Sequence, residues 1–247
     1  MTTTAEAPGN QTSTQPKSRI LGVVRLHFMN TQTFVWVPVI VLCGVWLITL
    51  LIYWIISASG AEGPMYSGGS QAPLWYFAVV GTQAMNLTFY FSQAMSLTRR
   101  EFYLGSLTAA TISAVAISTV FVLLGLIEQA THGYGINGYF AYFPWVWAGG
   151  PFAAGLPYIV LTMLMFILGF WFAIVLKRFG TLILITTLLV IALVLLGGAA
   201  LISLNGAWLE VWMWVLETQC IGLTLWALGF CVVFAAGSYL TLRRLTA

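Results

Sequence analysis

The chain has 247 residues, of which 60% are hydrophobic and only 6% are charged. Soluble domains carry about 25% charged residues, so this composition excludes a soluble globular domain. The apolar surplus suits a bilayer, where lipid solvates the outward faces of helices. We therefore expect an all-α integral membrane protein, and we relate its net charge of +3 to membrane topology and not to a nucleic-acid partner.

The N-terminal region divides into two parts. Residues 1–18 are rich in Thr, Ser, Gln and Pro and have few apolar groups to bury, so they predict a disordered cytoplasmic N-terminus. Over residues 19–33, apolar side chains recur at helical spacing; they are Ile20, Val23, Val24 and Phe28. This segment is either an amphipathic connecting helix in the membrane interface or a plain charged flank of the first span.

Residues 34–247 are expected to form a six-span transmembrane domain, because a helix needs about 20 apolar residues to cross a bilayer. The six segments are Phe34–Ile56, Pro73–Met95, Leu104–Ile127, Ala154–Leu176, Thr181–Ile202 and Cys220–Leu240. An even number of spans places the N- and C-termini on the same side.

The basic residues predict which side this is. All nine Lys and Arg residues fall in four clusters on one side of the expected membrane: Lys17/Arg19/Arg25, Arg99/Arg100, Lys177/Arg178 and Arg243/Arg244. Four of the six acids fall in the opposite loops: Glu62, Glu128, Glu210 and Glu217. Loops rich in Lys and Arg stay cytoplasmic, so both termini are expected in the cytoplasm.

The second span carries polar side chains at a spacing of three, four and three, which places them on one face of an α-helix. They are Gln83, Asn86, Tyr90 and Gln93. Amides in lipid cost free energy unless they find partners. This face therefore either hydrogen-bonds a neighbouring helix or lines a translocation path.

The connection after the second span, from Ser96 to Gly105, is compact and charged. Thr98 is expected to cap a helix with Glu101 in its first turn. Phe102 then adds an apolar knob beside the exposed Arg pair. The connection is either a docking element for a soluble partner or a simple topology anchor.

The connection before the sixth span, residues 205–219, predicts an amphipathic helix at the outer interface or one that dips back into the membrane. Trp208 and Trp212 share one face of it. Tryptophans at this level either form the aromatic belt of a membrane protein or contribute to an outer gate.

Several kinds of chemistry have no residues to support them. The lysines, Lys17 and Lys177, do not lie in a Gly-rich phosphate-binding frame, so the chain cannot hydrolyse ATP by that route. His27 and His132 fall on opposite sides of the expected membrane, which leaves no shared metal site. No set of residues for hydrolytic catalysis is present, and we do not expect an enzyme or a cofactor bound to this chain.

The connection between the second and third spans resembles the signature of type-2 ABC exporter permeases, the transmembrane subunits of bacterial ATP-driven exporters. In that family the loop commonly reads Gly-x-Ser/Thr-Arg-Arg/Lys-x-Phe/Tyr, with a small residue soon after. The matching residues here are Thr98, Arg99, Arg100, Phe102 and Gly105. Ser96 stands where glycine is usual.

The resemblance implies a coupling helix at Thr98, Arg99, Arg100, Glu101 and Phe102 that binds a separate nucleotide-binding ATPase subunit. That partner would hold ATP and Mg, and Arg25 on the connecting helix would also touch it. A second copy of the chain, or a similar permease, would complete a path lined by the second and fifth spans. The protein would lie in the bacterial cytoplasmic membrane, surrounded by lipid.

The expected cargo is apolar or amphipathic: a drug, an antibiotic or antimicrobial peptide, or a lipid-like molecule. Two other classes stay open. A non-transport scaffold or signalling subunit could use the same docking loop. A passive channel or ion-coupled carrier is disfavoured because no carboxylate is expected in mid-span.

Overall fold

The computed structural model describes residues 17–29, 32–61, 63–89, 92 and 97–243. Most of the expected disordered N-terminus, residues 1–16, lies outside this part of the chain. Lys17 and Ser18 begin a helix instead.

The elements follow one another in this order: α1 (Lys17–Met29), π-helix η1 (Gln32–Trp36), α2 (Val37–Ala58), strand β1 (Met65–Tyr66), 3₁₀ helix η2 (Gly68–Gln71), α3 (Ala72–Gln83), π-helix η3 (Ala84–Thr88), α5 (Arg99–Ala130), helical turn η4 (Gly133–Asn137), strand β2 (Gly138–Tyr139), α6 (Pro144–Trp147), α7 (Pro151–Leu204) and α8 (Trp208–Arg243). Proline lies in the first turn of α2, α3, α6 and α7. A helix start tolerates proline because the first N–H groups have no partner within the helix.

The described residues include four helices that are long and apolar enough to cross a bilayer. They are Gln32–Ala58, Arg99–Ala130, Pro151–Leu204 and Trp208–Arg243. The fold is therefore that of an all-α membrane protein, as the composition predicts.

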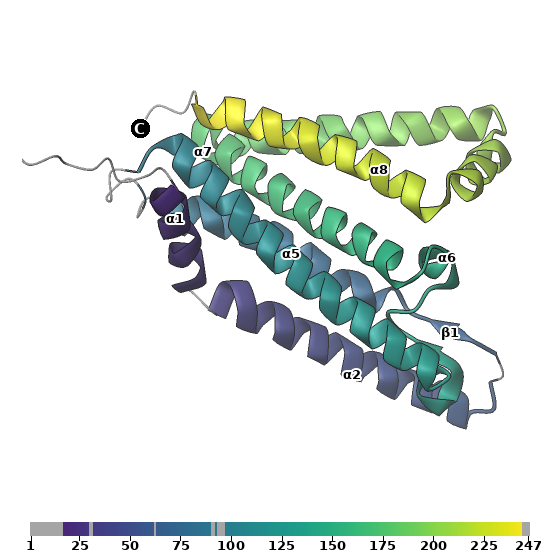
Figure 1. The fold of residues 1–247 in the computed structure, drawn as a ribbon. Helices are drawn as coiled ribbons and strands as arrows, with labels where there is room; N and C mark the ends of the chain where they lie inside the picture. The colour runs from purple at the N-terminus through teal and green to yellow at the C-terminus, as the bar shows by residue number, and fades with distance from the viewer. Residues whose placement is uncertain (1–16, 30–31, 62, 90–91, 93–96, 244–247) are drawn as a thin grey trace, which may run out of the picture.

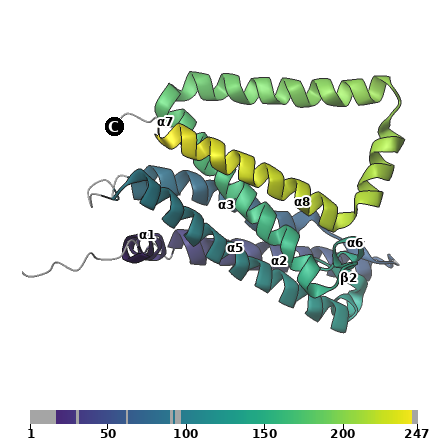
Figure 2. The same cartoon turned by 45° about the horizontal axis from the view of Figure 1, so that its top comes forward.

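Two of these helices are interrupted. In α7, Gly180 has φ 81° and ψ 175°, a left-handed φ that favours glycine. Figures 1 and 2 show the chain doubling back there, so that residues 181–204 return along the molecule. In α8, Gln219 has φ 54° and ψ 174°, and a short helix of residues 208–218 precedes the long one. The expected second span, Pro73–Met95, lies partly outside the described residues.

Residues 181–204 are more exposed than the rest of the bundle. Figure 2 shows this segment standing apart from the C-terminal part of α8, and none of its residues belongs to the buried core. Its side chains are almost all apolar, so lipid or another protein surface must cover them.

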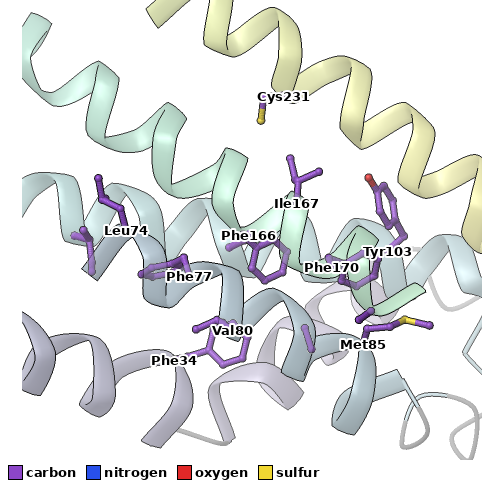
Figure 3. Packing of buried hydrophobic residues seen from close by; sticks show 14 of the residues in the cluster. Phe34, Leu74, Phe77, Val80, Met85, Tyr103, Phe166, Ile167, Phe170 and Cys231 are labelled. Atoms are coloured by element: carbon purple, nitrogen blue, oxygen red, sulfur yellow. The ribbon is translucent and has the colours of Figure 1, made fainter. Parts of the chain in front are cut away.

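The core lies where α3, α5 and α7 cross. Figure 3 shows Phe166, Ile167 and Phe170 of α7 among Phe77 and Val80 of α3. Glycines permit the close approach of α3 and α7. A Cβ at Gly81 would overlap the carbonyl oxygen of Phe166, and one at Gly169 would overlap that of Ala78. Small residues at crossings are a common device for close helix packing in membranes.

A short parallel ladder joins β1 and β2, pairing Met65 with Gly138 and Tyr66 with Tyr139. It lies at the end of the bundle opposite α1 (Figure 1), and the sequence gives no clear signal for it. The ladder and α6 close this end, which we call the far end.

Candidate functional site

The predicted docking segment, residues 98–102, begins α5 at the end of the bundle that also holds α1 and the C-terminal end of α8 (Figure 1). Thr98 is the N-cap, with extended backbone angles of φ −71° and ψ 150°. The Glu101 N–H donates to Thr98 Oγ1 at 3.2 Å, and the Thr98 N–H donates to Glu101 Oε2 at 2.9 Å. This reciprocal capping box confirms the helix start that the sequence predicts.

The two arginines have different surroundings. Arg99 Nη1 donates to the carbonyl oxygens of Arg243 at 3.2 Å and of Leu242 at 3.5 Å. The last carbonyls of a helix have no partner within it, so Arg99 caps α8. Arg100 is exposed and lines a groove of about 530 Å³ between α5 and α8. Of the two, Arg100 is the side chain available to a soluble partner.

Phe102 is not a surface knob, and the expectation of an exposed aromatic side chain there is wrong. Its exposed fraction is 0%. The Phe102 ring lies 5.3 Å from the Phe89 ring, edge to face, and 6.2 Å from the Phe170 ring. The aromatic position of the motif therefore holds α5 in the bundle. The next residue, Tyr103, donates its hydroxyl to Ala235 O of α8 at 2.7 Å.

A buried histidine fixes α1 against α5. His27 Nδ1 lies 3.0 Å from Val23 O, and Nε2 lies 3.2 Å from Ser106 Oγ. A carbonyl can only accept, so Nδ1 carries the proton and Nε2 accepts from the Ser106 hydroxyl. Burial lowers the pKa of His27 from its ordinary value, although the hydrogen bond to Val23 opposes the shift. Arg25 lies on the exposed side of the same helix.

The candidate path residues are only partly described. Gln83 is half-buried at the end of α3, and Asn86 is exposed within η3. Tyr90 and Gln93 lie outside the described residues. A π-helix has more residues per turn than an α-helix, so the α-helical spacing behind the single polar face does not hold through η3. Whether these four side chains line a path stays a prediction.

The π-helix η3 has a contact that the sequence does not reveal. Lys177 of α7 donates from Nζ to Met85 O at 2.8 Å, and its Nζ lies 5.9 Å from the centre of the Phe89 ring. From the sequence alone, Lys177 indicates only the topology. In the structure its side chain also joins the first half of α7, just before the break at Gly180, to η3.

Trp208 and Trp212 lie in the short helix before Gln219, and both are exposed, Trp212 at 61%. That helix confirms the helix predicted for this connection, whereas its place at the outer interface stays a prediction. A gating role for the two tryptophans stays a prediction.

The sequence predicts that Glu128 lies in an outer loop, and this prediction is wrong. Glu128 lies in the last turn of α5 with an exposed fraction of 0%. Its Oε2 accepts backbone N–H groups of Phe140, Ala141 and Tyr142 at 3.1, 2.9 and 2.8 Å, and Oε1 accepts the Tyr134 hydroxyl at 3.2 Å. One carboxylate thus organises the loop that closes the far end. An acid at the end of an apolar run, before a Gly-rich segment, is the only sequence signal for it.

Among the described residues, no group of three or more His, Cys, Asp or Glu side chains is placed to hold a metal ion.

No protein-family model matches the chain, and comparisons with curated proteins and with solved structures also gave no match.

Proposed function

We propose that the chain is the transmembrane permease subunit of an ATP-driven exporter in the bacterial cytoplasmic membrane. It would move an apolar or amphipathic cargo, with a second copy or a similar permease beside it. ATP and Mg would bind to a separate ATPase subunit, so this chain itself would not be an enzyme.

The observation that carries the proposal is the construction of the segment around Arg100. The capping box fixes its backbone, Arg99 joins it to α8, and the buried Phe102 joins it to α7. A displacement of Arg100 by a partner would therefore reach several helices at once, because packed interiors transmit strain. A loop that served only as a topology anchor would not need these connections.

We further propose six membrane crossings with both termini in the cytoplasm. The reversal at Gly180 supports this count, because residues 151–179 and 181–204 then act as separate spans. A helix of 24 residues is about 36 Å long, enough to cross a hydrocarbon core of about 30 Å. Arg100, Arg178 and Arg243 would lie on the same, cytoplasmic side, as the distribution of positive charge favours.

A pull-down in mild detergent tests the docking site. The tagged wild type is compared with Arg100→Glu, and Arg178→Glu serves as the matched control because Arg178 is another exposed arginine. The proposal predicts that an ATPase subunit co-purifies with the wild type and with Arg178→Glu and is lost from Arg100→Glu. Phe102→Ala is unsuitable because it would open a cavity in the core. Equal recovery of the ATPase with both variants would reject Arg100 as the docking residue.

A further inference from the structure

A cavity of about 410 Å³ lies at the far end of the bundle, since its lining includes Tyr66 of β1 and Trp145 of α6. It is partly open to the surroundings, and its lining comes from the β1–η2 connection, α3, the loop before α6, α6, α7 and α8. A second hollow of about 190 Å³ extends from it between α7 and α8. Both are lined by Trp145, Pro157, Leu161 and Cys220. We call the two together the far-end cavity, and their combined size is within the range of small-molecule sites.

One end of this cavity is polar. Ser67, Ser70 and Gln71 line it there. Ser70 is only 5% exposed, and the neighbouring Ser67 Oγ accepts the Gly69 N–H at 2.9 Å. Hydroxyl and amide side chains both donate and accept hydrogen bonds, so this end suits an uncharged polar headgroup.

The other end is apolar. Val160 of α7 faces Leu223 and Ala227 of α8 across the crevice. Aromatic side chains also line the larger hollow, where the Tyr66 and Phe143 rings stack at 5.9 Å. Among the described residues, no charged side chain lines either hollow. A charged ligand group would therefore enter without a counter-charge, at a large desolvation cost.

The wall of the cavity is held in place by the contacts of the far end. The Tyr158 ring stacks on Phe121 at 4.5 Å, and its hydroxyl donates to Ala141 O at 3.1 Å. Glu128 binds the N–H of the same Ala141. The cavity is thus preformed, and a ligand need not order it on binding.

We propose that the far-end cavity binds an uncharged amphiphile. Its hydroxyl- or amide-bearing headgroup lies against Ser67, Ser70 and Gln71, and its apolar chain lies between α7 and α8. The idea that this class of molecule is the transported cargo rests on the proposed function. Binding itself depends only on the cavity.

Photo-crosslinking tests the site in the full chain, purified into phosphatidylcholine nanodiscs. The probe is a monoacylglycerol with a diazirine near the end of its acyl chain. A fatty acid with the same diazirine chain is the matched charged probe. We expect the monoacylglycerol to label peptides containing Val160 and Leu223, and unlabelled monoolein to compete. The fatty acid should label them about tenfold less, because its carboxylate has no counter-charge there.

Two variants and one control localise the binding. Ser70→Ala removes only the hydroxyl and adds no atom to the cavity, so labelling should fall about fivefold for one lost hydrogen bond. Leu161→Trp fills the cavity and should abolish labelling. Leu156→Trp, on an exposed position of the same helix, should leave it unchanged.

Equal labelling by both probes, or labelling spread evenly over the exposed residues 181–204, would overturn the inference. Both of these results are obtained with the wild-type chain, so they do not depend on whether a variant folds. The same preparations are assayed for a co-purifying ATPase, which separates this inference from the proposed function. An ATPase without labelling rejects the cavity site alone, whereas labelling without an ATPase retains the site and counts against the exporter.

Discussion

At the scale of single residues, adjacent side chains in the docking segment have separate roles. Arg99 caps the carbonyls of α8, Arg100 points to the exposed groove, and Phe102 is buried among aromatic rings. The sequence motif alone does not show that these neighbouring residues have different roles. It follows from the direction of each side chain around one helical turn.

Removing the two arginines singly should separate stability from partner binding. Arg99→Ala should lower the free energy of unfolding by about 1 kcal/mol, because two carbonyls of α8 lose their donor. Arg100→Ala should leave stability within about 0.5 kcal/mol of wild type, as for most surface changes. Thermal unfolding in detergent measures both. A larger loss for Arg100→Ala would contradict the assigned contacts.

His27 should make the docking of α1 sensitive to acid. Burial lowers the pKa of His27 below its ordinary 6.5, so the undocked helix binds a proton more readily than the docked one. Docking is therefore at full strength above about pH 6.5 and weakens as the pH falls toward the lower, folded-state pKa. Hydrogen exchange of α1 should increase between pH 7.5 and pH 5. His27→Gln, which does not titrate, should show no such dependence on pH.

Glu128 is expected to be the residue on which the far end depends most. Glu128→Gln removes the charge from four hydrogen bonds and should destabilise the protein by about 2–3 kcal/mol. The readout is thermal unfolding, together with faster hydrogen exchange at residues 138–142. Glu210→Gln, at an exposed position, is the control and should have little effect.

At the scale of elements, long apolar runs predict the helices well. The runs at Leu104–Ile127 and Cys220–Leu240 fall within α5 and α8. Hydropathy succeeds because lipid favours backbone groups paired within one helix. It does not predict η3, the β1–β2 ladder or the burial of Glu128, because these depend on contacts between residues distant in the sequence.

The crossing of α3 and α7 should tolerate no added methyl group. Gly81→Ala and Gly169→Ala should each destabilise the protein by about 1–3 kcal/mol or more, since the new Cβ meets backbone that cannot rotate away. Gly44→Ala in α2 is the control, because a Cβ there has no neighbour within 4 Å. Similar unfolding temperatures for all three variants would contradict the close crossing.

At the scale of the whole molecule, a basic end carries the docking segment, and the opposite, far end is closed by the contacts of Glu128 and contains the far-end cavity. The sequence predicts the basic end through its clustered arginines and the connection at Ser96–Gly105. It cannot predict the cavity, whose lining comes from four separate stretches of chain. Only the fold brings Ser70, Trp145 and Cys220 to one place.

The reversal at Gly180 should place the two ends of residues 181–204 on opposite sides of the membrane. In a background with Cys43, Cys220 and Cys231 changed to Ala, Asn205→Cys should react with an impermeant maleimide in intact cells. Phe179→Cys should react only after permeabilisation. Labelling of both from the same side would contradict six crossings.

The central claim is that this chain works with a separate ATPase through Arg100, and ATP hydrolysis by the purified assembly tests it most directly. The rate is measured in nanodiscs for wild type, Arg100→Glu and Arg178→Glu, with folding checked for each. The account predicts hydrolysis in the wild type and in Arg178→Glu, and its loss in Arg100→Glu. A folded wild-type preparation that neither carries an ATPase nor hydrolyses ATP would contradict it.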